Sequence, residues 1–327
     1  MSTVEVDRPG LDLDRPGLDR DRPGLDLDQP GLDQRPLLDA PPDWSLVGRT
    51  VFLVTQRVRY DYSGCVSDLR QRLMLVPPAV HGDQRRITWR VEASAPGRRS
   101  LCVDRFGNLV IQYRIPQADR SVAFTASALV ERTTCFEGHL LGPIPAFRRP
   151  SLLTSPDTEL RAVGRELTRH GWGPEAMAEH ICEWTASRLA FRSGVTTTTT
   201  TAVEACSFGL GVCQDYAHVM IAVCRAAGLA ARYVSGHLLG EGPSHAWVEV
   251  LVPTASGSAV RAVAFDPTHN RRAGLNYVSI ATGRDYRDVA PTSGTCTAEA
   301  PGRLEFAKRV GIAEMEVTDV SSERVSA

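Results

Sequence analysis

The hydrophobic residues of this chain change their spacing once, across a segment with four prolines, residues 143–156. Before that segment, β-branched and aromatic residues gather in short, partly alternating runs separated by Gly, Pro and Asn, a pattern typical of strands and turns. The runs cover residues 50–60, 71–76, 86–92, 108–113 and 121–132. Short strands at this spacing predict a β-sandwich domain over residues 44–142.

After the proline-rich segment, apolar residues fall at helical spacing over residues 157–170 and 174–189. Pro174 suits the first turn of a helix. Thr201 and Glu204 fit a capping box, so a short helix should begin there, preceded by an exposed loop that contains most of the threonine run 196–201. We therefore expect an α+β fold in which residues 143–156 are a linker and residues 157–327 form a second domain.

Residues 7–34 are four tandem heptapeptides built on Asp-Arg/Gln-Pro-Gly-Leu-Asp. The period of seven does not indicate a coiled coil, because a proline in every repeat removes a helical hydrogen bond and Pro-Gly suits a type II turn. One or two leucines per repeat bury too little apolar surface to offset chain entropy. Residues 1–43 are therefore predicted to be a disordered tail, with a repeated docking motif as the functional alternative.

Charge and composition exclude several classes of partner. The formal net charge of −1 indicates neither a nucleic-acid nor a membrane-surface partner. No apolar run is long enough to span a bilayer and the N-terminus lacks the features of a signal peptide, so the cytoplasm is the expected location. The chain has a single lysine, Lys308, which we attribute to a base composition that favours arginine codons.

The cysteine pattern argues against both a metal and a disulfide framework. Eight cysteines occur without a CxxC pair or a spacing typical of metal ligands. Most should be buried, small hydrophobic residues with free thiols. The cysteine spacing predicts no metal site, and a special role for any cysteine must come from its neighbours.

Cys213 has such neighbours. It stands where a loop with Gly209 and Gly211 gives way to helical apolar spacing that ends at Gly228. The two glycines permit a tight entry, so Cys213 is predicted to lie in the first turn of a buried helix. There the unpaired amides and the positive end of the helix dipole favour a thiolate and can hold a developing oxyanion.

Three strands of an antiparallel sheet are predicted next, over residues 231–238, 246–252 and 260–265. If the last two form a hairpin with its turn centred between Ala255 and Ser256, His245 lies opposite Asp266. A carboxylate beside an imidazole fixes its tautomer and leaves the second nitrogen for a thiol. Cys213, His245 and Asp266 are therefore the candidate nucleophile, base and orienting group.

The other candidates carry less chemistry. Gln214, Trp184, Tyr233 and Trp247 are candidates for stabilising the oxyanion or supporting the three central residues, although their spacing fixes none of these roles. His218 should point away from the face of the helix that carries Cys213. We interpret His218, His237 and His269 as structural.

Four segments closely resemble bacterial transglutaminase-like proteins: Gly-Val-Cys-Gln-Asp-Tyr-Ala-His at 211–218, Ala-Arg-Tyr-Val-Ser-Gly at 231–236, Ser-His-Ala-Trp-Val-Glu-Val at 244–250 and Phe-Asp-Pro-Thr at 265–268. Residues 283–286 and 288–291 extend the match, and Asp104–Asn108 looks like part of the N-terminal β domain of such enzymes. The resemblance implies a papain-like transglutaminase core in which Cys213 is the nucleophile, His245 the general base and Asp266 the orienting residue. The threonine run is longer than the family's usual stretch, and a second oxyanion donor is not identifiable.

The resemblance also implies acyl transfer from an amide or peptide substrate without a cofactor. Water is some four orders of magnitude more concentrated than a millimolar amine, so amine transfer needs about 5 kcal/mol of discrimination. Since the sequence shows no acceptor site, we favour hydrolysis by a protease or amidase. Protein-glutamine crosslinking and a non-catalytic binding module that retains the three residues are the alternatives. A peptide or protein substrate is the expected partner, and the oligomeric state is left open.

Overall fold

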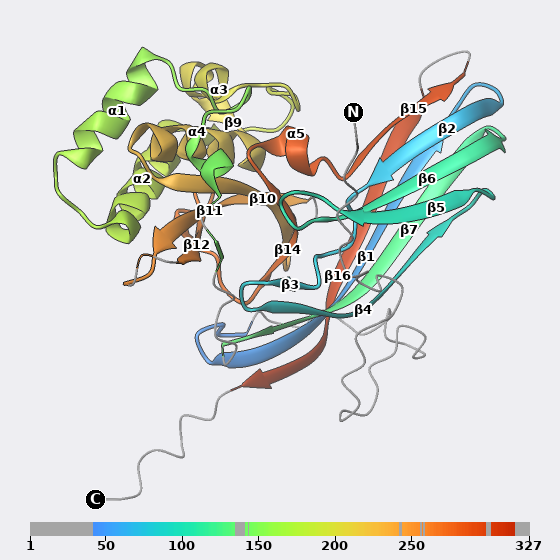
Figure 1. The fold of residues 1–327 in the computed structure, drawn as a ribbon, viewed down its shortest axis with the longest axis horizontal. Coiled ribbons are helices and arrows are strands. Elements are labelled where there is room, and N and C mark those ends of the chain that lie inside the picture. The colour runs from blue at the N-terminus through green and yellow to red at the C-terminus, as the bar shows by residue number, and fades with distance from the viewer. Residues whose placement is uncertain are drawn as a thin grey trace, which may run out of the picture.

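The computed structural model describes residues 42–134, 141–142, 144–241, 244–255, 257, 259–298 and 302–317. The heptapeptide repeats, and with them the prediction of a disordered tail, lie outside the described residues. Figure 1 shows a helical half beside a half made of long strands, so the expected α+β fold is confirmed. Within the described ranges, no helix combines the length and the apolar composition needed to cross a membrane.

The strand-rich half is a β-sandwich. Its first seven strands are β1 (Val47–Asp61), β2 (Val66–Leu73), β3 (Val80–His81), β4 (Gln84–Ala93), β5 (Arg98–Val103), β6 (Leu109–Ala118) and β7 (Ser121–Thr133). Together with β15 (Thr292–Thr297) and β16 (Arg303–Val317), they form two antiparallel sheets with the strand orders β16-β1-β7-β4-β3 and β15-β2-β6-β5. Val58 and Phe124 from the first sheet share a buried cluster with Leu69 and Ile111 from the second. Two sheets joined by one apolar layer form the predicted sandwich, and each predicted run overlaps one of these strands.

The last two strands return to this sandwich. β15 (Thr292–Thr297) pairs with β2, and β16 (Arg303–Val317) pairs with β1 along nearly its whole length. In Figure 1 the orange and red strands of the C-terminal part lie beside the blue strands of the N-terminal part. Our sequence-based division placed residues 157–327 together and did not anticipate this return. The reason is that β16 is an edge strand with only Ala313 buried, so its hydrophobic alternation is weak.

The other half packs helices on a third antiparallel sheet, which we call the central sheet, with strand order β13-β12-β11-β10-β14. Its strands are β10 (Ala230–Leu238), β11 (His245–Pro253), β12 (Val260–Asp266), β13 (Arg271–Arg272) and β14 (Tyr277–Gly283). The helices are the 3-10 helix η2 (Pro145–Arg148), α1 (Thr158–Thr168), α2 (Pro174–Arg188), α3 (Ala202–Phe208), α4 (Cys213–Ala226) and α5 (Tyr286–Val289). A short parallel pair joins β8 (Ala190–Phe191) to β9 (Leu210–Gly211).

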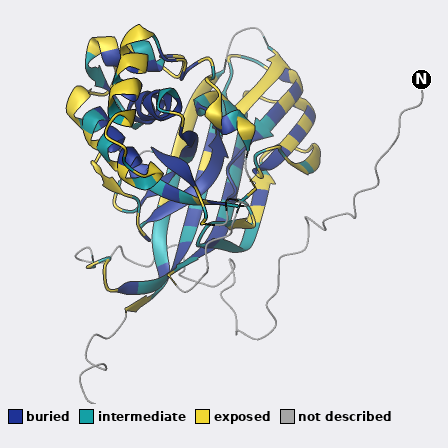
Figure 2. Ribbon diagram, turned by 60° about the vertical axis from the view of Figure 1, so that its left-hand side comes forward, coloured by how far each residue is buried: buried dark blue, intermediate teal, exposed yellow. Residues whose placement is uncertain are grey.

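Helix α4 is the centre of this half. Every residue from Gln214 to Arg225 is buried, and the helix contacts α1, α2, α3, β10 and β11. Figure 2 shows buried residues concentrated between the helices and the sheets, with exposed residues on the outer helices. Two local signals predicted from the sequence are present: Pro174 opens α2, and Thr201 and Glu204 form the capping box of α3. Asp157, whose side chain accepts from the N–H of Leu160, caps α1.

The predicted register of the β11–β12 hairpin is wrong by two residues. Val248 pairs with Phe265 and Pro253 with Val260, so Asp266 lies beside Trp247 rather than opposite His245. The hairpin loop contains Gly257 with a φ of +68°, and an isolated bridge joins Val260 to Leu141. A shift of two residues keeps every side chain on its predicted face, because side chains alternate with a period of two.

The central sheet lies between the helices and the sandwich. Val278 and Ile280 on β14 pack against Phe52 and Val54 on β1. β14 is an edge strand, and side-chain amides from the sandwich satisfy part of its backbone. The amide of Gln84 both donates to the carbonyl of Ser279 and accepts from its N–H, each at 2.8 Å. Asn108 does the same for Thr282, at 2.7 and 2.8 Å.

Candidate active site

Cys213 is the first residue of α4, as predicted. The backbone N–H of Val212 donates to Oδ2 of Asp215 at 2.8 Å, which closes the entry to the helix. Gly211 permits this closure, because a Cβ at that position would come within 2.6 Å of the Asp215 Cβ. Thr196, from the threonine run, donates its hydroxyl to the same Oδ2 at 2.7 Å. The Asp215 carboxylate therefore fixes the position of Cys213, because its hydrogen bonds join the start of α4 to the preceding loop.

His245 and Asp266 lie together at the end of the central sheet. His245 begins β11 and Asp266 ends β12, and the His245 Nε2 is 2.7 Å from the Asp266 Oδ2. Both side chains are buried. Burial lowers the pKa of His245, but hydrogen bonds to Asp266 and Cys213 and the attraction of their negative charges outweigh it and raise the pKa to about 10. The structure thus brings the three central residues together.

Asp266 receives an unusual number of donors. Its Oδ2 accepts from His245, from the Tyr277 hydroxyl at 2.7 Å and from His269 Nδ1 at 2.8 Å. Its Oδ1 accepts the backbone N–H of Thr268 at 3.0 Å. Burial raises the pKa of Asp266, but the hydrogen bonds from His245, Tyr277 and His269 hold it well below the ordinary value. The carboxylate is therefore ionised and fixed in orientation.

Two residues of the site were missed from the sequence. His269, which we had interpreted as structural, contacts Asp266 with Nδ1 and Glu241 with Nε2, the latter at 2.9 Å. The other oxygen of Glu241 lies 3.3 Å from Nδ1 of His245. The interval of three residues between Asp266 and His269 was the available signal, since a turn after a strand brings such a pair together. Glu241 lies in a loop before β11 and carried no signal of its own.

Cys213 and His245 open into one cavity of about 590 Å³. It is lined by Phe191, Ser193, Val212, Cys213, Glu241, Ser244, His245, Thr268 and His269. The Cys213 Sγ is 3.9 Å from the carbonyl oxygen of Ser244, the residue before His245. Since Asp266 occupies Nε2 of His245, Nδ1 is the nitrogen that faces the thiol. A substrate carbonyl in this cavity would meet the thiol, the imidazole and the start of α4 together.

The four supporting candidates have different surroundings. Gln214 donates its side-chain amide to the carbonyl of Thr197 at 3.0 Å, so the amide is directed at the threonine loop. Trp184 packs against the buried cluster around α4 and does not line the cavity. Tyr233 is buried on β10, its ring 5.2 Å from that of His218. Trp247 stacks on His245 with ring centroids 6.2 Å apart. Of the four, Trp247 alone has a ring contact with one of the three central residues among the described contacts.

His218 and His237 are not among the residues that line the cavity. His218 is buried and accepts the backbone N–H of Tyr286 at 3.2 Å, a packed position of the kind expected for a structural histidine. Burial lowers its pKa to about 4. His237 is buried on β10, with Nδ1 3.0 Å from Nζ of Lys308 on β16. The single lysine is thus placed against the central sheet by the returning strand.

One group of side chains has ligand atoms close enough for a metal. Among the described residues, one atom each of His245, Asp266 and His269 lies within 4.8 Å of the other two. The same side chains are already joined by hydrogen bonds through Oδ2 of Asp266. A cation could therefore bind only by displacing the protons that hold the imidazoles in place. We infer that these side chains hold and transfer protons and do not bind a metal.

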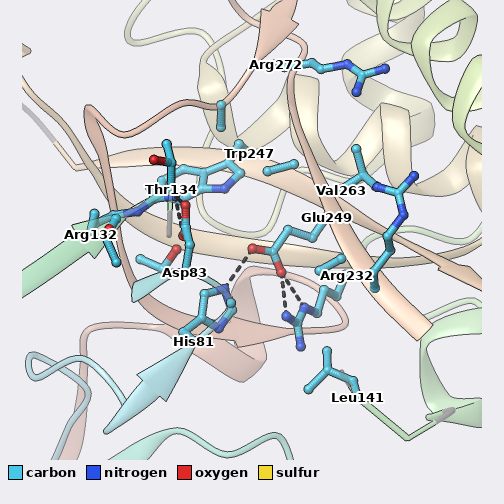
Figure 3. A pocket seen from close by; sticks show the side chains of 17 residues that line it. His81, Asp83, Arg132, Thr134, Leu141, Arg232, Trp247, Glu249, Val263 and Arg272 are labelled. Atoms are coloured by element: carbon cyan, nitrogen blue, oxygen red, sulfur yellow. Dashed lines mark hydrogen bonds and ion pairs between the residues drawn. The ribbon is translucent and has the colours of Figure 1, made fainter. Parts of the chain in front are cut away.

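A second cavity of about 460 Å³ shares no lining residue with the first. Figure 3 shows the Glu249 carboxylate in it, between His81 on β3 and Arg232 on β10. His81 Nε2 and Arg232 Nε each lie 2.7 Å from a Glu249 oxygen. Burial raises the pKa of Glu249, but its interactions with Arg232 and His81 hold it well below the ordinary value. The described lining of this cavity includes no cysteine. The contact between His81 and Glu249 joins the sandwich to the central sheet.

The fold and the site define a papain-like α+β protein with a cysteine-centred cavity. The model of the transglutaminase-like superfamily matches residues 161–267, and that of the bacterial transglutaminase-like N-terminal region matches residues 52–131. The chain is 30% identical over 279 residues to uncharacterised proteins of Mycobacterium bovis and Mycobacterium tuberculosis, covering 76% of this chain and 88% of each relative. The chain therefore belongs to the transglutaminase-like superfamily, as the resemblance predicted.

A solved structure shows the same fold. The crystal structure of a candidate cysteine protease from Cytophaga hutchinsonii superposes with a TM-score of 0.67 at 19% identity. The match covers 83% of this chain and 93% of that one. It includes both the sandwich and the helical half, since neither alone spans so much of the chain. At this identity, the likeness establishes the fold, and the activity must be argued from the site.

Proposed function

We propose that this protein is a cysteine-dependent hydrolase of amide bonds in a peptide or protein substrate. The observation that carries the proposal is the alignment of three groups: a thiol at the start of a buried helix, an imidazole that shares its cavity, and a buried carboxylate 2.7 Å from that imidazole. Membership of the transglutaminase-like superfamily supports cysteine-dependent chemistry in general. The choice of hydrolysis is our own inference.

In the first half-reaction, His245 takes the thiol proton of Cys213 through Nδ1, and the thiolate attacks the carbonyl carbon of the scissile amide. The backbone N–H groups at the start of α4 face the oxygen that becomes negative, and the positive end of the helix stabilises it. The imidazolium then gives its proton to the leaving amine as the C–N bond breaks. Asp266 stabilises the imidazolium and fixes the ring, which leaves an acyl group on Cys213 as a thioester.

In the second half-reaction, His245 deprotonates a water molecule that attacks the thioester carbonyl. The carboxylic acid leaves and the thiol of Cys213 is restored. An amine in place of water would produce a crosslink instead. Because the cavity is open to water, and amine transfer needs about 5 kcal/mol of discrimination against it, we favour hydrolysis.

The test begins with reactivity at Cys213. Alkylation by iodoacetamide should be mapped by peptide mass, because Cys65, Cys102 and Cys296 are also exposed. We expect His245→Ala to slow alkylation of Cys213 at neutral pH, and Cys213→Ala to abolish turnover of a peptide library. His180→Ala, an exposed histidine on α2, is the matched control. Unchanged alkylation of Cys213 in His245→Ala would favour the binding-module alternative and overturn the enzyme proposal.

A second assay separates hydrolysis from crosslinking. The protein is incubated with a glutaminyl peptide and a labelled primary amine, and released ammonia or cleaved peptide is compared with incorporated label. Hydrolysis predicts that cleavage or ammonia release exceeds label incorporation. Dominant incorporation of the label would identify a crosslinking enzyme instead.

A further inference from the structure

Glu241 competes with Cys213 for one nitrogen atom. The Nε2 of His245 is committed to Asp266, so both Cys213 and Glu241 must use Nδ1. Oε2 of Glu241 lies 3.3 Å from that nitrogen, and Oε1 lies 2.9 Å from Nε2 of His269. The carboxylate therefore spans two imidazoles that are both also bound to Asp266.

The competition defines a resting state. When His245 is an imidazolium, Nδ1 carries one proton, which can be directed at the Cys213 sulfur or at the Glu241 carboxylate. A carboxylate is the stronger hydrogen-bond acceptor, and hydrogen bonds between charged partners are about twice as strong as neutral ones. The thiol in turn has the Ser244 carbonyl oxygen within 3.9 Å as an acceptor. With Glu241 in place, the thiolate–imidazolium pair is less favoured than in the same site without it.

The cavity indicates what would draw Glu241 away. Its described lining contains no lysine or arginine, and apart from Glu241, Cys213 and the two histidines its side chains are uncharged. The Glu241 side chain is 34% exposed, so its oxygens can accept further hydrogen bonds from a bound group. The nearby Lys308 is held by His237, and burial lowers its pKa to about 8 against the attraction of Glu241 and Cys213. Apart from the two imidazoles, the described lining offers Glu241 no cationic partner, so a cationic group on the substrate would be the competing complement.

We propose that Glu241 is a specificity-determining residue that selects amide substrates carrying a cationic group next to the scissile bond. In the free protein, Glu241 is bound to His245 and His269. A cationic group entering the cavity pairs with the carboxylate and releases Nδ1 of His245 to Cys213. This inference rests on the proposed function of Cys213 and His245, and it adds the class of substrate.

The test compares substrates that differ only in charge. Pairs of peptides carry either lysine or acetyl-lysine at each position beside the cleaved bond, and kcat/KM is measured for the full-length protein and for Glu241→Gln. We expect the wild-type protein to prefer the lysine peptide by about tenfold or more. Glu241→Gln should lose this preference, with a higher kcat/KM for the acetyl-lysine peptide and a lower one for the lysine peptide. Glu183→Gln, which removes a carboxylate paired with His180 on α2, should keep the preference.

Alkylation provides a readout that needs no substrate. We expect iodoacetamide to label Cys213 about tenfold faster in Glu241→Gln than in the wild-type protein, since Nδ1 is then released. A preference that survives in Glu241→Gln, equal losses on both peptides, or slower alkylation would overturn the inference. Failure of the proposed function has another signature: turnover of both peptides would persist in Cys213→Ala.

Discussion

Asp266 shows how a single side chain organises this site. It has no solvent exposure, yet it accepts hydrogen bonds from two imidazoles, a phenol and the backbone of the turn that follows it. A buried carboxylate is tolerated only when such partners replace its hydration. The position of His245 therefore depends on several residues beyond the three that the sequence singled out.

Tyr277 tests that dependence at a single atom. Tyr277→Phe removes the donor to Asp266 Oδ2 and the acceptor for Arg271 Nε, which lies 2.9 Å from the hydroxyl oxygen. We expect kcat to fall about tenfold with little change in KM, because the ring of His245 is less firmly held. Tyr60→Phe, whose hydroxyl meets Thr292 in the sandwich, is the control. Equal kcat in the two variants would mean that Tyr277 does not position Asp266.

The same variant has a pH signature. Because the folded protein holds the pKa of Asp266 below its unfolded value of about 3.9, ionised Asp266 adds stability above that pH, and this stability is lost as the pH falls through the folded pKa. Tyr277→Phe should therefore lower the free energy of unfolding by about 1–2 kcal/mol at pH 6–8. The difference from wild type should shrink as the pH falls below about 4. Denaturant unfolding across this range measures it, and a constant difference would contradict the linkage.

At the scale of elements, the features that were predictable are those set by local chemistry. The start of helix α4 at Cys213 was predictable because residues close in the sequence determine it: the glycines before Cys213 and the helical spacing of the apolar residues after it. For the β11–β12 hairpin, the sequence predicted the correct face for each side chain but the wrong strand register. The exact pairing depends on a loop with a positive-φ glycine at position 257. His269 and Glu241 lie in loops after β12 and before β11, where no periodicity fixes a side chain. Their roles needed the three-dimensional structure.

The entry to α4 can be tested at Gly211. Gly211→Ala would place a Cβ within 2.6 Å of the Asp215 Cβ and 2.8 Å of its Oδ2. The Asp215 carboxylate must then shift away from Val212 and Thr196, which should cost about 1–3 kcal/mol of stability. We expect alkylation of Cys213 to slow as well, because the start of the helix moves. Gly311→Ala on β16, where the added Cβ meets nothing within 4 Å, is the matched control. Normal stability and alkylation in Gly211→Ala would show that the helix entry tolerates the added carbon.

At the scale of the whole molecule, the chain is not a simple succession of two domains. β15 and β16 return from the helical half to pair with β2 and β1, and β16 brings Lys308 against His237 on β10. This return was not predictable from the sequence, because strand pairing across more than 200 residues leaves no local pattern and edge strands alternate weakly. The sandwich is thus a support for the central sheet, and stability of the two halves should be linked.

Gln84 and Asn108 provide the sharpest test of that link. Each side-chain amide satisfies both backbone groups of one residue on the edge strand β14, Ser279 for Gln84 and Thr282 for Asn108. Replacing either by alanine leaves a buried N–H and C=O without that partner, and one such group costs about 1–3 kcal/mol. We therefore expect the double variant Gln84→Ala/Asn108→Ala to lose more stability than either single variant in denaturant unfolding. Since β14 also begins at Tyr277, kcat should fall together with stability. Gln112→Ala, an exposed glutamine on β6, should change neither.

If the double variant unfolds in two separate transitions with the helical half unaffected, the sandwich does not support the active site. The geometry around Asp266 must then be maintained by the central sheet alone.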